Sequence, residues 1–157
     1  MKRSILTGAA AALLASLALV GAGTASAAQA GAGQLPAMHS YEGVRYTSGG
    51  IGSDESSAMK AAASSWPLSL EFAIKTGAQA EYASNVHVLL KNGQGATVLK
   101  ATSQGPFLLA EVPPGSYRLE ATLDGNTLQR EVAVRKGQAA HVMLEWPAGT
   151  DSRAPAR

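Results

Sequence analysis

The feature that most constrains this fold is an alternation of apolar and polar residues that recurs between residues 68 and 146. In its first instance, Leu68, Leu70 and Phe72 alternate with polar or small residues, which gives an extended segment one apolar face. About seven such segments follow one another at intervals of roughly 11 residues, which is typical of a β-sandwich or barrel. Their polar outer faces favour antiparallel pairing. The predicted strands cover residues 68–74, 86–90, 96–101, 106–112, 117–123, 128–134 and 140–146.

Residue pairs that favour tight turns separate these strands. Asn92-Gly93 and Asp124-Gly125 are pairs of the kind found in hairpin turns, because both residue types tolerate positive φ. Pro114-Gly115 suits the centre of a type II turn, since proline fixes φ and glycine accepts a positive φ. We expect these pairs to join neighbouring strands.

The residues before the first strand predict one short helix. Residues 54–65 are mostly good or neutral helix formers, and Ser53 or Asp54 can act as the N-cap. Pro67 ends the helix, because it biases Trp66 away from the helical region. The expected fold is therefore mainly β, a seven-stranded antiparallel β-sandwich preceded by one short α-helix.

The N-terminal residues have the three parts of a secretory signal peptide. Lys2 and Arg3 form a positive start, and residues 9–20 are apolar and uncharged. This run is shorter than the roughly 20 residues that a membrane-spanning helix needs. Small residues then predict cleavage after Ala27, with a second candidate cut after Ala30.

Signal removal changes the charge of the chain and indicates where it acts. Loss of Lys2 and Arg3 lowers the basic side chains from 13 to 11, which equals the number of acidic ones. A neutral mature chain without a clustered basic face argues against a nucleic-acid partner. With no cysteine, it has neither a disulfide framework nor a thiol nucleophile. We expect a periplasmic or secreted protein with no transmembrane segment after signal removal.

Composition divides the chain into five parts. The two ends are rich in small and polar residues without an apolar period, which is typical of flexible segments. The predicted parts are a signal peptide (1–27), a flexible leader (28–44), a Gly-rich loop and helix (45–66), a β-sandwich domain (67–147) and a disordered tail (148–157).

The run from residue 83 to residue 146 resembles the carboxypeptidase regulatory-like domain, a transthyretin-like (prealbumin-like) seven-stranded β-sandwich. The matching residues are Asn85-Val86-His87-Val88 before the Asn92-Gly93 turn, Gly105-Pro106-Phe107, and the run Val112-Pro113-Pro114-Gly115-Ser116-Tyr117-Arg118-Leu119. Relatives often carry an acidic residue where this chain has Ser103-Gln104-Gly105. These residues form turns and core positions, so the resemblance implies a fold and no particular activity.

A second resemblance lies upstream, between residues 46 and 55. This segment is similar to one that precedes such a module in small exported proteobacterial proteins, which implies a periplasmic protein with no established chemistry. It is our candidate interaction segment. A Gly-rich loop before a helix can also bind an anion through exposed N–H groups, but two acidic residues would repel a phosphate here. The candidate residues are Tyr46, Gly49, Gly50, Gly52, Asp54 and Glu55.

The histidines give weak signals for chemistry. His87 and His141 fall on outward strand positions, where they could meet across neighbouring strands with Glu145 as a third metal ligand. We favour the interpretation that they are solvated surface side chains. Transthyretin-like hydroxyisourate hydrolases carry paired histidines and a C-terminal Tyr-Arg-Gly-Ser. In this sequence the third histidine, His39, lies in the predicted leader, and the last residues do not match that motif.

Two short runs match motifs of penicillin-binding enzymes. Ser57-Ala58-Met59-Lys60 fits their S-x-x-K element, and Lys75-Thr76-Gly77 fits their K-T-G element. The S-D-N element is missing, and the spacing leaves no room for the domain that separates the two motifs in those enzymes. We therefore predict no catalytic residue, no cofactor and no metal site.

The tryptophans bear on the choice between two functions. An exposed Trp66 would offer a flat surface on which a sugar can stack, but the favoured role of this residue is to close one end of the sandwich. Trp146 falls on an inward-facing strand position. The predicted function is an exported, non-catalytic module with an interaction or structural role, whose partner is an envelope protein or a glycan. The alternative is a periplasmic module that binds a carbohydrate or another small ligand.

Overall fold

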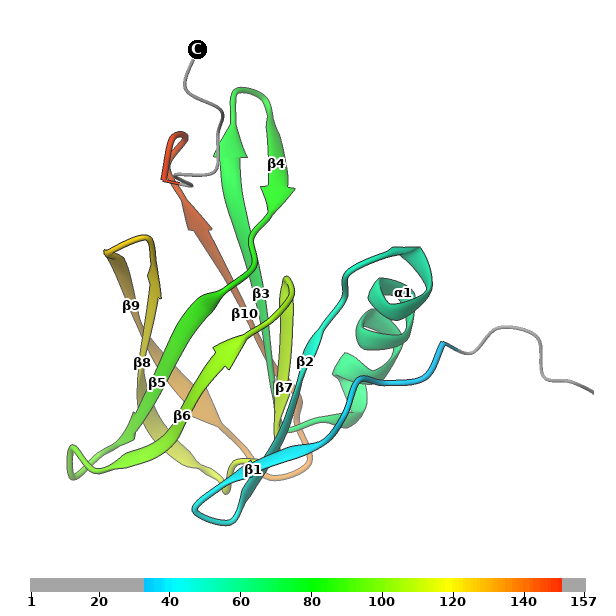
Figure 1. The fold of residues 1–157 in the computed structure, drawn as a ribbon. Coiled ribbons are helices and arrows are strands. Elements are labelled where there is room, and N and C mark those ends of the chain that lie inside the picture. The colour runs from blue at the N-terminus through cyan, green and yellow to red at the C-terminus, as the bar shows by residue number, and fades with distance from the viewer. Residues whose placement is uncertain (1–32, 151–157) are drawn as a thin grey trace, which may run out of the picture.

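The computed structural model describes residues 33–150, which form a mainly β structure of ten strands and one α-helix (Figure 1). Helix α1 spans Ser53–Ala62 and continues into a 3₁₀ turn, η1, at Ala63–Ser65. This agrees with the predicted helix. The predicted signal peptide, its cleavage site at Ala27 and residues 151–157 of the predicted tail lie outside the described residues.

The strands form two sheets. Sheet A has six strands in the order β1-β2-β7-β3-β10, with β4 paired to β3 beyond the end of β7. Sheet B has four strands in the order β6-β5-β8-β9. The bounds are β1 His39–Tyr41, β2 Val44–Gly49, β3 Leu68–Thr76, β4 Gln79–Tyr82, β5 Val86–Asn92, β6 Thr97–Ser103, β7 Phe107–Ala110, β8 Gly115–Leu123, β9 Asn126–Val134 and β10 Ala140–Trp146.

The prediction of seven antiparallel strands needs two corrections. Each predicted strand is present, but β1, β2 and β4 raise the number to ten. Strand β1 lies inside the predicted leader, and β2 lies where a Gly-rich loop was expected. These three strands carry few apolar residues and therefore lack the alternating pattern. Backbone pairing with neighbouring strands holds them in the sheet. In addition, β10 pairs with β3 in parallel.

Two of the predicted local features also differ. Gly52 is the helix N-cap with φ 89°, and neither Ser53 nor Asp54 makes a capping hydrogen bond. Gly115 does not have the positive φ of a type II turn and instead begins β8. The Asp124-Gly125 hairpin turn is confirmed, because both residues have positive φ and join β8 to β9.

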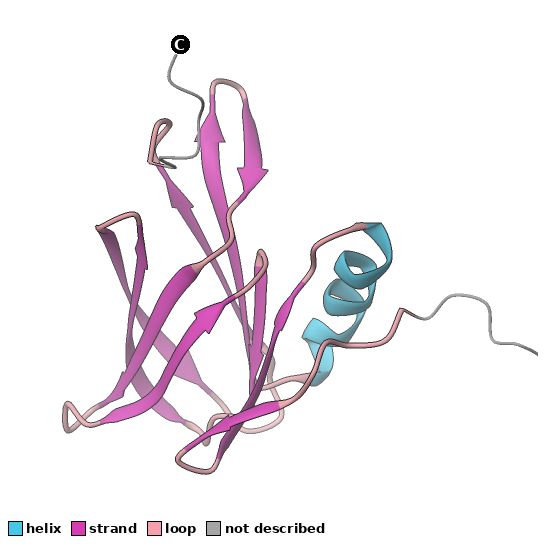
Figure 2. Ribbon diagram, viewed as in Figure 1, coloured by secondary structure: helices cyan, strands magenta, loops and turns pink. Residues whose placement is uncertain are grey.

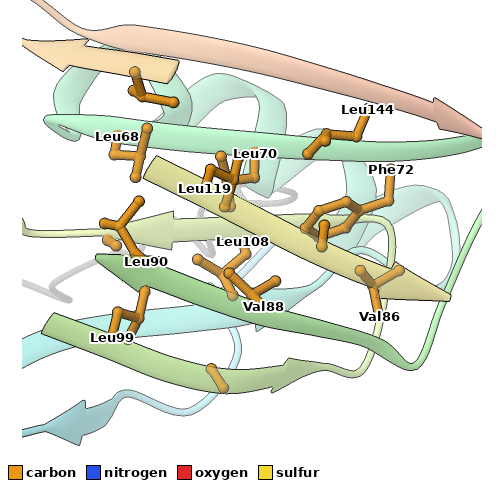
Figure 3. Close-up of a cluster of buried hydrophobic side chains, with 14 of the residues drawn as sticks. Leu68, Leu70, Phe72, Val86, Val88, Leu90, Leu99, Leu108, Leu119 and Leu144 are labelled. Carbon is orange, nitrogen blue, oxygen red and sulfur yellow. The ribbon is translucent and has the colours of Figure 1, made fainter. Parts of the chain in front are cut away.

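The main core is the larger cluster of buried side chains, and both sheets contribute to it. Side chains of the two sheets point toward one another in Figure 3, among them Leu70 from β3 and Leu119 from β8. The alternation predicted these inward positions correctly. Trp146 is fully buried here, and its Nε1–H donates a hydrogen bond of 2.9 Å to the carbonyl of Asn126.

A second buried group, the helix cluster, is formed by Met59, Trp66, Phe107 and Leu109. It lies beneath α1, which packs outside sheet A beside β2 and β7 (Figure 2). Strand β7 serves both groups, since Phe107 and Leu109 belong to the helix cluster and the alternate residues belong to the main core. Trp66 is therefore buried, with 9% of its surface exposed.

Within residues 33–150, no helix has the length and apolar character needed to cross a membrane.

Candidate functional site

The structure divides the candidate interaction segment between buried and exposed positions. Tyr46 is half-buried on β2, and its ring lies 5.5 Å from that of His39. Gly49 and Gly50 are buried, whereas Gly52 and Asp54 are exposed; Glu55 is half-buried. The six residues are adjacent, but they do not form one continuous exposed surface.

The buried glycines hold the start of α1 against sheet A. The Glu55 carboxylate accepts hydrogen bonds from the backbone N–H groups of Gly50, at 2.6 Å, and Ile51, at 3.4 Å. A side chain at Gly49 would collide with this carboxylate. A side chain at Gly50, where φ is 99°, would meet the ring of Phe107. These glycines therefore permit close packing. The Glu55 carboxylate pairs with backbone N–H groups of the loop that would otherwise lack an acceptor.

Two large exposed apolar side chains are found here, one on the loop itself and one on the neighbouring strand β4. Ile51 is 67% exposed, and Tyr82 on β4 is 51% exposed. The Tyr82 ring packs edge-on against Phe107 at 5.4 Å, and Phe107 in turn lies beneath Gly50. Lys60 Nζ lies 5.3 Å from the centre of the Tyr82 ring. We call Ile51, Lys60 and Tyr82, with the Phe107 edge between them, the Ile51–Tyr82 face.

Lys60, the lysine of this face, interacts with neighbouring aromatic residues. Interaction with the Tyr82 hydroxyl raises the pKa of the exposed Lys60 ammonium, which keeps this group charged. Lys60 belongs to the S-x-x-K match, yet its contacts are with aromatic rings. Ser57 lies exposed on α1, and Lys75 lies exposed near the end of β3.

The structure does not bring His87 and His141 together, so the alternative of a shared metal site is wrong for this pair. His87 on β5 belongs to sheet B, and its Nδ1 lies 2.9 Å from Thr102 Oγ1. His141 on β10 belongs to sheet A, where it contacts Ser69 at 2.8 Å and Glu71 at 3.4 Å. No group of three or more potential metal ligands occurs among the described residues.

Sequence reasoning missed a groove of about 380 Å³ at one end of the molecule. Three connections form it: the η1–β3 junction, the β7–β8 loop and the β9–β10 loop. The one sequence signal near it was Trp66, which the structure buries in the helix cluster beside this groove. The lining residues are Ser64, Ser65, Trp66, Pro67, Val112, Pro114, Val134, Arg135, Lys136, Gly137, Gln138 and Ala139.

The groove combines apolar walls with positive charge. Arg135 and Lys136 are exposed side chains that line it, and neither makes an ion pair with any described residue. Among the described residues, no aspartate or glutamate lines the groove. The local charge is therefore positive even though acidic and basic residues balance over residues 28–157.

In comparisons with known proteins, no protein-family model matches the chain and no curated protein matches it.

Proposed function

We propose that the two sheets form a transthyretin-like β-sandwich related to the carboxypeptidase regulatory-like domain. The seven strands expected from the sequence support this, because they divide into three in sheet A and four in sheet B around one core. The Val112–Leu119 run adds support: the Tyr117 hydroxyl donates a hydrogen bond of 2.5 Å to the carbonyl of Pro113 and so fixes the entry into β8.

We further propose that this protein is an exported, non-catalytic module that contacts another protein of the cell envelope. The observation that carries this proposal is the exposed Ile51 on a loop that Glu55 and the glycines hold in place. A rigid loop loses little conformational entropy when its exposed side chain enters a partner's pocket. The Ile51–Tyr82 face presents an aliphatic side chain, an aromatic side chain and a cation beside the aromatic ring, which fits a partner with an apolar pocket and an acidic rim.

The test compares two exposed apolar positions. The chain, tagged at its C-terminus and exported by its own N-terminal residues, would be used to capture partners from envelope extract. Ile51→Ser should abolish capture of a specific partner, while Met143→Ser on β10 should not. Met143 is a matched control because it is also a large apolar side chain, 47% exposed.

Thermal unfolding of both variants checks that they remain folded, which both exposed positions should allow. Equal loss or equal retention of the partner in the two variants would contradict the proposal.

A further inference from the structure

We propose that the groove beside Trp66 is a binding site for a small organic carboxylate with an apolar body. This site is separate from the Ile51–Tyr82 face, and neither proposal depends on the other. The volume of about 380 Å³ lies within the range of small-molecule sites. Loops held by a rigid scaffold form it, which is the usual arrangement of a binding site.

The apolar part of the ligand is inferred from the walls. Five apolar residues contribute to these walls: Trp66, Pro67, Val112, Pro114 and Val134. Trp66 is too buried to offer a ring face as a platform, which disfavours a stacked sugar. An aliphatic chain needs only apolar contact and fits such walls better.

The charged part of the ligand is inferred from Arg135 and Lys136. These neighbours supply two positive groups at one side of the groove, and within residues 33–150 no acidic residue is part of the lining. A carboxylate would gain charge-assisted hydrogen bonds from both. A bound cation would be repelled, and a neutral ligand would leave both groups without a counter-charge.

The two tryptophans provide an internal test. Trp66 lines the groove, whereas Trp146 lies in the main core with its indole N–H donated to Asn126. Their indole N–H signals in an NMR spectrum of the ¹⁵N-labelled exported chain therefore report on two separate places. We expect octanoate to shift the Trp66 signal and the backbone signals of residues 134–139 saturably, and to leave Trp146 unmoved.

Matched ligands and variants then separate charge from apolar contact. Acetate lacks the apolar body and 1-octanol lacks the charge, so both should bind at least about tenfold more weakly than octanoate. The double variant Arg135→Gln, Lys136→Gln should weaken octanoate binding by about five- to tenfold. Lys100→Gln with Arg130→Gln removes the same charge from exposed strand positions outside the groove and should leave binding unchanged.

The outcomes decide the proposal. The proposal is supported by a saturable shift of the Trp66 signal that requires both the aliphatic chain and the carboxylate group of the ligand. It is overturned if octanoate leaves the groove signals unmoved, if 1-octanol binds as tightly as octanoate, or if the two double variants behave alike.

Discussion

The main core and the helix cluster meet at strand β7, whose alternate residues enter one or the other. The main core draws on both sheets, and nearly every position in it follows an alternation of period two. The helix cluster has four buried members that come from α1, its C-terminal end and β7. Its closure depends on glycines and on one buried carboxylate contact at Gly50. The comparison shows that a repeated pattern can specify a large core, whereas a small one depends on individual close contacts.

The largest expected effect is in the main core. Leu119→Ala should lower the free energy of unfolding by about 3–5 kcal/mol, because a fully buried leucine between two sheets leaves a cavity that cannot collapse. Met59→Ala should cost less, about 2–3 kcal/mol, because one helix covers the cluster and can shift inward. Urea unfolding of both variants measures the difference. An equal or reversed order would show that the helix cluster is as rigid as the main core.

The next effect concerns the glycines beside the helix. Gly50→Ala should cost about 2–3 kcal/mol, since the new side chain combines a positive φ with a collision against Phe107. Gly52→Ala shares the positive φ but meets open space, so it should cost about 1 kcal/mol. The same unfolding measurement compares them. Identical losses would mean that the backbone angle alone matters and that the close packing against Phe107 contributes nothing.

The smallest effect tests the entry into β8. Tyr117→Phe should cost about 1 kcal/mol at neutral pH through loss of the hydrogen bond to Pro113. Burial raises the pKa of the Tyr117 hydroxyl above its usual value of 10.0. Its stabilising contribution should therefore be complete below pH 10 and be lost as pH rises through the raised pKa. Stability measured from pH 8 upward should fall more steeply for the natural chain than for the variant; parallel curves would contradict this.

The predictable parts of the fold are those where side-chain pattern and structure have the same period. Seven strands of the main core were predicted in this way, and so was α1, whereas β2, which contributes Val44 to that core, was not. Strand β4 was missed because its residues are exposed, and β2 was missed because it buries Thr47 and Ser48. Parallel pairing of β3 with β10 leaves no trace in either strand, since alternation is the same for both directions.

The candidate site was also predictable only in part. The sequence placed the glycines and acidic residues of the segment before α1 together, but it could not reveal that Gly49 and Gly50 face inward. For Gly49 this depends on Pro36 and Glu55, and for Gly50 it depends on Phe107, which follows nearly sixty residues later. The groove was missed for a related reason, because its walls come from three loops that only the completed fold brings together.

The pairing of β3 with β10 has a consequence for how the chain reaches this state. Ser69 and His141, which face each other across the pair, are 72 residues apart. Contacts at such separation form slowly, because a long loop must close before they stabilise anything. Until residues 140–146 arrive, β3 has an open edge to which a strand of another chain can attach. In the folded chain the edge of sheet A is β10, whose residues are less buried than those of β3. A nascent or truncated chain that lacks β10 exposes the edge of β3 in its place and should therefore aggregate more readily.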